Sequence, residues 1–119
     1  MKFALTEDQL KIQQMVKELV AKEVAPNAKA WDKGEDFTPI YKMLKEKFAP
    51  LGLMGLPYPT EYGGAGADQI SYVLAGFEIN KACASTGCAY SVHISLNGWP
   101  IFAYGTEEQR QKYSAPLFQ

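Results

Sequence analysis

Apolar residues recur at helical spacing through the first part of the chain. Thr6-Glu7-Asp8-Gln9 has the form of a capping box, in which the Thr6 hydroxyl and the Gln9 amide bond free N–H groups of the first turn. Pro26 is expected to kink or restart this helix, and Gly34 is expected to end its continuation over 28–31. The apolar positions follow the i, i+3, i+4, i+7 pattern of an amphipathic helix: Leu5, Ile12, Met15, Val16, Leu19, Val20 and Val24.

The same spacing predicts further helices. Thr38 is the expected N-cap of a second helix with Pro39 at its first position, and this helix ends before Pro50. Asp68 is expected to cap a third helix, which ends near Ala84. Its one face carries Ile70, Val73, Leu74 and Phe77, with Glu78 and Lys81 on or near the other side. A second capping box over 106–109 opens a last helix. No segment alternates apolar and polar residues for long, so the predicted fold is all-α, a compact multi-helix bundle.

The central part of the chain, from Ala82 to Thr106, contains no formally charged residue. Its serines, threonines, asparagine and histidine make it too polar for a membrane span, which needs about 20 mostly apolar residues. We therefore expect a helix buried inside a protein core. Small residues, among them Gly87 and Ala89, allow another backbone or a ligand to come close. This helix is the strongest functional indication in the residue pattern.

A glycine- and proline-rich stretch at about 50–67 interrupts the helical pattern. Its composition excludes a helix or a central strand. Because it also carries leucines, a methionine and tyrosines, we expect an ordered, packed loop. A phosphate-binding role for 63–66 is disfavoured, since the spacing of known phosphate loops is absent and no strand precedes it.

Composition narrows the classes of function. The chain has 119 residues, enough for one domain, and 47% of them are hydrophobic, as in globular proteins. A formal charge of −1 and a pI near 5.8 give no reason to expect a nucleic-acid partner or an anionic membrane surface. Cys83 and Cys88 are too far apart on one helix to bridge and too few for a zinc site, so free, buried thiols are expected. No signal or transit peptide is visible at the start, which favours a cytoplasmic location.

Few residues suggest catalysis by themselves. His93 is the only histidine, and a hydrogen-bonded core histidine is a more economical interpretation than a catalytic base. Glu61 and Glu78 have no nearby carboxylate for paired acid–base chemistry, so a structural or solvent role is favoured for each. From residue pattern alone, the chain is a helical domain with one helix suited to contact a ligand.

Several ordered motifs resemble the N-terminal domain of the acyl-CoA dehydrogenases, from about Leu5 to Leu117. The most specific match is Leu51-Gly52-Leu53-Met54-Gly55-Leu56 followed by Glu61-Tyr62-Gly63-Gly64-Ala65-Gly66. It is preceded by Leu5-Thr6-Glu7-Asp8-Gln9, Glu23-Val24-Ala25-Pro26 and Trp31-Asp32. Ala84-Ser85-Thr86-Gly87, Ser91-Val92-His93, Ser95-Leu96 and Tyr104-Gly105-Thr106-Glu107-Glu108-Gln109 follow in family order.

This resemblance implies a flavoenzyme that oxidises the Cα–Cβ bond of an acyl-CoA thioester. In that family a glutamate base removes the α-proton, the β-hydride passes to FAD, and electrons usually continue to an electron-transfer flavoprotein. Members have three domains and commonly form homotetramers. Residues 1–119 correspond to the first domain, so the base is expected beyond Gln119, and no FAD or catalytic residue is assigned within the chain.

The resemblance also assigns a substrate-binding role by position. Ala89, Tyr90 and His93 fall where the family's central helix lines the acyl end of the substrate pocket. The spacing from Gly87 to Pro100 resembles short-chain, butyryl-CoA-type members. Tyr90 is bulkier than expected there and Asn97-Gly98-Trp99 is atypical, which leaves aromatic or branched acyl groups open. The alternatives are an acyl-CoA oxidase-type relative and a non-catalytic helical interaction module.

Overall fold

Helix α1 spans Glu7–Leu19 and continues through a π-helical turn, Val20–Val24, in a computed structural model that describes residues 3–119. The predicted capping box is confirmed: the Gln9 N–H donates to the Thr6 hydroxyl at 3.2 Å, and the Gln9 amide oxygen accepts the Thr6 N–H at 2.9 Å. The chain turns at Pro26, and α2 covers Ala28–Lys33 before Gly34, as expected. Val16 and Val24 are fully buried on the inner face of this segment.

Helix α3 spans Thr38–Met43 and continues through a π-helical turn, Leu44–Phe48. The predicted cap is wrong by one position, because Phe37 is the N-cap and Pro39 the second helical residue. The reason is Asp36, whose Oδ1 accepts the Thr38 N–H at 2.9 Å. This aspartate bonds an N–H of the first helical turn, which has no partner within the helix.

The glycine- and proline-rich segment folds into three short 3-10 turns, Ala49–Leu51, Leu53–Gly55 and Thr60–Tyr62. Leu53, Leu56 and Tyr58 are buried there. Gly63 has a φ of 83°, which favours glycine. A Cβ on Gly64 would overlap the backbone carbonyl of Tyr58. The segment is therefore packed against itself too closely to admit larger side chains.

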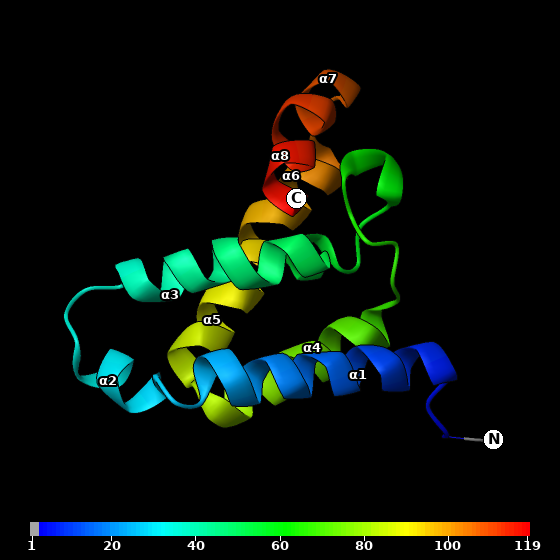
Figure 1. The fold of residues 1–119 in the computed structure, drawn as a ribbon. Helices are drawn as coiled ribbons and strands as arrows, with labels where there is room; N and C mark the ends of the chain where they lie inside the picture. The colour runs from blue at the N-terminus through cyan, green and yellow to red at the C-terminus, as the bar shows by residue number, and fades with distance from the viewer. Residues whose placement is uncertain (1–2) are drawn as a thin grey trace.

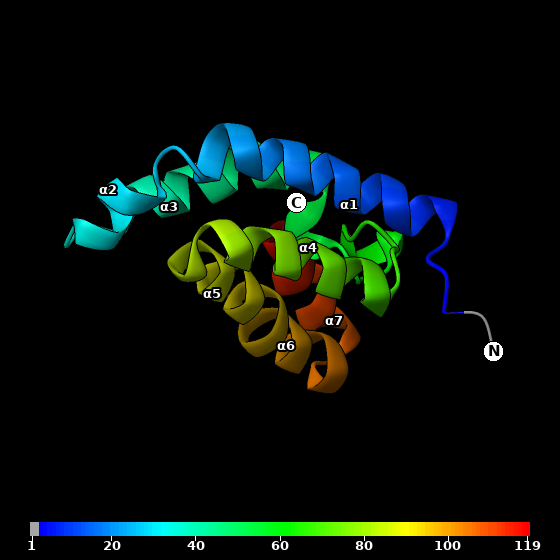
Figure 2. The same ribbon diagram turned by 90° about the horizontal axis from the view of Figure 1, so that it is seen from below.

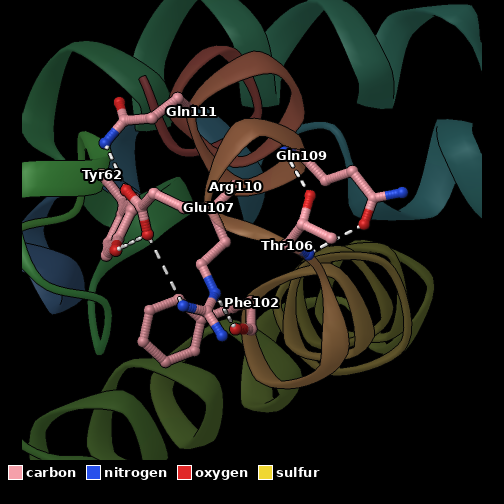
Figure 3. Close-up of polar contacts among 7 residues, drawn as sticks. All are labelled: Tyr62, Phe102, Thr106, Glu107, Gln109, Arg110 and Gln111. Atoms are coloured by element: carbon pink, nitrogen blue, oxygen red, sulfur yellow. Dashed lines mark hydrogen bonds and ion pairs between the residues drawn. The ribbon is translucent and has the colours of Figure 1, made fainter.

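A polar cluster ties this segment to the C-terminal helices (Figure 3). The Tyr62 hydroxyl donates to Glu107 Oε2 at 2.8 Å, and the Gln111 amide donates to Oε1 of the same carboxylate at 3.1 Å. Arg110 Nε donates to the Phe102 carbonyl at 2.8 Å, with its guanidinium over the Phe102 ring. The hydrogen bonds from Gln111 and Tyr62 hold the pKa of Glu107 below its usual range. The bond to Glu107 in turn raises the pKa of Tyr62.

Helix α4 spans Gln69–Ala82 and lies along α1 (Figures 1 and 2). Asp68 is its N-cap, as predicted, accepting the Ser71 N–H at 2.7 Å and also the Gln9 amide of α1 at 2.6 Å. Its packing differs from the usual expectation that an apolar face is the buried one. Ile70, Val73 and Phe77 are exposed, while the buried side consists of Ser71, Ala75, Glu78 and Ile79.

Two of the buried residues, Ser71 and Ala75, are small, which suits the packing of α4 against its neighbours α1 and α5. Glu78 can lie on that side since its carboxylate has partners. Oε1 accepts the Gln13 amide of α1 at 3.0 Å, and Oε2 lies 3.1 Å from Lys81 Nζ. The buried acid thus joins two helices by hydrogen bonds rather than by apolar contact.

The rest of the chain is helical. α5 spans Ala84–Val92 and continues through a π-helical turn, His93–Gly98; α6 covers Trp99–Tyr104. α7 is Glu107–Gln109, followed by a π-helical turn, Arg110–Ser114, and α8, Ala115–Phe118. The Thr106–Gln109 capping box is confirmed. Within residues 3–119 no strand occurs, so the all-α prediction is confirmed.

In the view of Figure 1, helix α5 lies between α3 and α4, and it packs against α4. The Tyr90 ring meets Phe48 edge-on, with 6.1 Å between centroids, and Phe118 stacks on Tyr58 at 3.8 Å. Tyr90, Phe48 and Phe118 are fully buried. The charge-free stretch therefore begins as a core helix, as its composition indicates.

Candidate functional site

A cavity of about 530 Å³ opens between α3, α5 and the end of the chain. One wall comes from a face of α3, a second from α5 and the turn after it, and a third from Pro116 and Leu117 of α8. Most of the lining is apolar. The volume lies in the range of small-molecule sites, which are commonly 300–1,000 Å³. The residues of the first two walls include Phe37, Ile40, Tyr41, Leu44, Ala89, Val92, His93 and Asn97.

Ala89 and His93 are brought together in this cavity, one helical turn apart on α5 and the turn that continues it. Ala89 is partly buried, and its methyl group leaves space that a larger side chain would fill. Ser85 lies one turn earlier on the same wall. A stripe of small side chains followed by an imidazole therefore forms the α5 side of the cavity.

The His93 ring is fixed by the far end of the chain. Its Nε2 lies 2.8 Å from the carbonyl oxygen of Leu117, which can only accept a hydrogen bond. Partial burial lowers the pKa of His93, against a smaller raising effect of the Leu117 contact. The neutral form with the proton on Nε2 is therefore favoured. His93 is a hydrogen-bonded histidine that also lines a cavity.

Tyr90 is separated from the other two predicted site residues. It is fully buried, does not line the cavity, and packs between Phe48 and Tyr72 on the core side of α5. The reason is the helical turn of about 100° per residue, which points Tyr90 away from its neighbour Ala89. Its hydroxyl has no hydrogen-bond partner in the structure.

The glycine stretch does not form a phosphate site. The N–H groups of residues 63–67 all donate to carbonyl oxygens of the same segment, at 2.8–3.1 Å. Gly64 donates to Pro59, Ala65 to Gly55 and Gly66 to Tyr58. A phosphate cradle needs such donors free and directed at the ligand. The glycines serve close packing within the loop.

The other candidate residues are exposed to solvent or have structural partners. Glu61 is exposed, and Glu78 is held by Gln13 and Lys81. Residues 3–119 contain no group of three histidine, cysteine, aspartate or glutamate residues that could hold a metal ion. Both cysteines are free, but only Cys83 is buried. The expectation of two buried thiols is wrong for Cys88, which lies on the outer face of α5.

Sequence reasoning missed most of the cavity. Phe37, Ile40, Tyr41 and Leu44 have the spacing of one helix face, so that wall carried a readable signal. No sequence pattern indicates the contribution of Leu117, because its approach to His93 depends on how the last helix folds back.

None of the helices in the described range has the length and apolar character needed to cross a membrane.

The comparisons with known proteins all indicate one family. A family model described as "Acyl-CoA dehydrogenase, N-terminal domain" matches residues 6–119. The chain is 46% identical over 117 residues to "Probable acyl-CoA dehydrogenase YngJ" of Bacillus subtilis. It is 44% identical over 117 residues to the short-chain-specific acyl-CoA dehydrogenase of Clostridium acetobutylicum. Each match covers 98% of this chain but 30% of the relative.

A solved structure shows the same fold. It is described as the electron transferring flavoprotein of Acidaminococcus fermentans, in work on flavin-based electron bifurcation. One of its chains matches 99% of this chain with a TM-score of 0.87 and 42% identity, and the match covers 30% of that chain. The sequence thus spans about a third of the length of the proteins that it matches.

Proposed function

The chain belongs to the acyl-CoA dehydrogenase family, and from this premise we propose that the protein carrying it is an FAD-dependent dehydrogenase of acyl-CoA thioesters. Residues 1–119 form the N-terminal helical domain of a three-domain enzyme in this proposal. The match over nearly the whole chain and about 30% of each relative supports this assignment.

The N-terminal domain contributes a wall of the acyl pocket. The observation that carries this proposal is that Ala89 and His93, assigned to substrate by position, line one largely apolar cavity of about 530 Å³. An apolar cavity favours the hydrocarbon part of a thioester, since each buried methylene contributes about 0.8 kcal/mol. The similarity to a short-chain-specific relative supports a short acyl group. Tyr90 supports the pocket from the core side rather than contacting the substrate.

Proton abstraction and most flavin contacts are assigned to the remainder of the enzyme. In residues 3–119 the glycine-stretch donors are already used, so this segment does not fit the phosphates of FAD. When bound, FAD would supply the hydride acceptor for the Cα–Cβ oxidation. An electron-transfer flavoprotein is the proposed electron acceptor, and a homo-oligomer the proposed assembly.

The test uses the product of the complete reading frame. The purified protein is expected to be yellow, and anaerobic addition of butyryl-CoA should bleach its oxidised-flavin absorbance. Ala89→Leu should lower kcat/KM for butyryl-CoA by about tenfold, or about 1.4 kcal/mol, because the larger side chain would fill cavity space that the acyl group needs.

Cys88→Leu is the matched control, since Cys88 is the exposed neighbour of Ala89 on the same helix. It should leave kcat/KM close to that of the wild type. Failure of every acyl-CoA to reduce the flavin would contradict the dehydrogenase activity. Equal effects of the two leucine substitutions would contradict the pocket role of Ala89.

A further inference from the structure

The polar groups around the cavity differ in how firmly they are placed. Lys45, Asn97 and Gln119 line the cavity but are exposed to solvent. Ser85 and His93 are partly buried in the α5 wall. Only His93 is also held by a second element, through the 2.8 Å contact of its Nε2 with the Leu117 carbonyl. The imidazole is therefore the best-fixed polar group in a mostly apolar lining.

Fixing one ring nitrogen determines the role of the other. The Leu117 carbonyl is an acceptor, so Nε2 must carry the proton and donate it. In the neutral ring Nδ1 then has a lone pair and can only accept. Nδ1 forms no hydrogen bond with any residue of the described chain. His93 thus lines the cavity with a preset acceptor and no free donor on its ring.

We propose that the cavity selects acyl groups carrying a hydroxyl at the end remote from the thioester, with His93 Nδ1 accepting that hydrogen bond. This inference rests on the proposed function, because it takes the cavity as the acyl site. A purely hydrocarbon chain would exclude water from Nδ1 without replacing its hydrogen bond, which penalises binding. A hydroxyl restores the bond.

The test compares matched acyl-CoA pairs with the complete enzyme. One pair is butyryl-CoA and 4-hydroxybutyryl-CoA; the other is 3-phenylpropionyl-CoA and 3-(4-hydroxyphenyl)propionyl-CoA. The measured quantity is the ratio of kcat/KM for the hydroxylated member to that for its partner. The wild-type ratio should reach about five in at least one pair, the effect of one neutral hydrogen bond.

Two substitutions separate the acceptor from the structural contact. His93→Gln places its amide near the position of Nε2, so it keeps the bond to Leu117 and loses the Nδ1 acceptor. His93→Asn places its amide oxygen near Nδ1 and loses the bond to Leu117. The ratio should fall to about one in His93→Gln and stay near the wild-type value in His93→Asn. Ser85→Ala is the control on the same wall and should keep the wild-type ratio.

Each outcome has a separate meaning. A wild-type ratio near one in both pairs, with normal oxidation of the unsubstituted thioesters, would overturn the inference and leave the proposed function intact. An unchanged ratio in His93→Gln, or equal loss in both His93 variants, would also overturn it. No flavin reduction by any of the four thioesters would instead overturn the proposed function.

Discussion

The Tyr58 hydroxyl donates its hydrogen bond to the backbone carbonyl of Ile94, joining the glycine- and proline-rich segment to the turn that follows α5. The same carbonyl accepts the N–H of Trp99, so both of its lone pairs are used. Burial raises the pKa of Tyr58 to about 12, which keeps the phenol protonated and able to donate at neutral pH. This contact fixes the loop against the helix that lines the cavity.

Tyr58→Phe should therefore destabilise the protein. The substitution removes the donor and keeps the ring stacked on Phe118, so the loss should be about 1 kcal/mol, the net value of one hydrogen bond. Denaturant unfolding of wild type and variant would measure it. A variant as stable as the wild type would show that the contact adds nothing to the fold.

Tyr90→Phe, in contrast to Tyr58→Phe, should not destabilise the protein. The Tyr90 hydroxyl is buried and has no hydrogen-bond partner among residues 3–119, and burial raises the pKa of the phenol strongly. Removing it should leave the free energy of unfolding unchanged or raise it by up to about 1 kcal/mol. Tyr90→Ala should instead cost about 3–5 kcal/mol by removing a core aromatic. A clear loss of stability in Tyr90→Phe would mean that the hydroxyl has a bonding partner.

Two glycine-to-alanine substitutions should have opposite effects on the stability of the protein. A Cβ at Gly64 would overlap the Tyr58 carbonyl, whereas a Cβ at Gly76 in α4 would meet nothing within 4 Å. Gly76→Ala should stabilise by up to about 1 kcal/mol, the difference in helix propensity. Gly64→Ala should lower the melting temperature sharply, because backbone must move. Similar melting temperatures for the two variants would contradict this account of the loop.

Local signals account for what could be predicted from the sequence. The capping boxes at Thr6 and Thr106 and the cap at Asp68 involve residues within three positions of each other, so the pattern alone specifies them. The predicted Thr38 cap was wrong for an equally local reason: Asp36 bonds the Thr38 N–H, and Thr38 is the first helical residue instead of the cap. Helix ends are decided by neighbours in the chain.

Features set by distant contacts could not be predicted in this way. The apolar stripe of α4 gives no sign that Glu78 is the buried residue, since that depends on Gln13 of another helix. Likewise, the family resemblance assigns a substrate-binding role to both Ala89 and Tyr90, which are adjacent in the chain. Ala89 lines the cavity, but Tyr90 is buried in the core. Which side of a helix meets solvent depends on its neighbours in space.

The contact between α1 and α4 should weaken in acid. Although burial opposes it, hydrogen bonds from Lys81 and Gln13 hold the pKa of Glu78 below its usual value of about 4.3. A group with a lowered folded-state pKa contributes stability above its unfolded pKa and loses it as pH falls through the folded pKa. Melting temperatures should therefore fall below about pH 4. Glu78→Gln should be less stable at pH 7 and less sensitive to acid; an equal acid response would exclude Glu78 as a cause.

The last prediction concerns the exposed stripe of α4. Ile70, Val73 and Phe77 are 52%, 64% and 57% exposed and lie on one helix face, so they form a continuous apolar strip rather than scattered residues. Such strips promote association. The 119-residue chain should therefore self-associate as its concentration rises, measured by sedimentation velocity. Val73→Lys should shift it toward monomer with little loss of stability, because Val73 is on the surface.

Leu10→Lys, at an exposed leucine of α1, is the control and should leave the self-association unchanged. A wild-type chain that stays monomeric at high concentration would contradict the prediction, and equal effects of the two lysines would show that charge, not the strip, controls association.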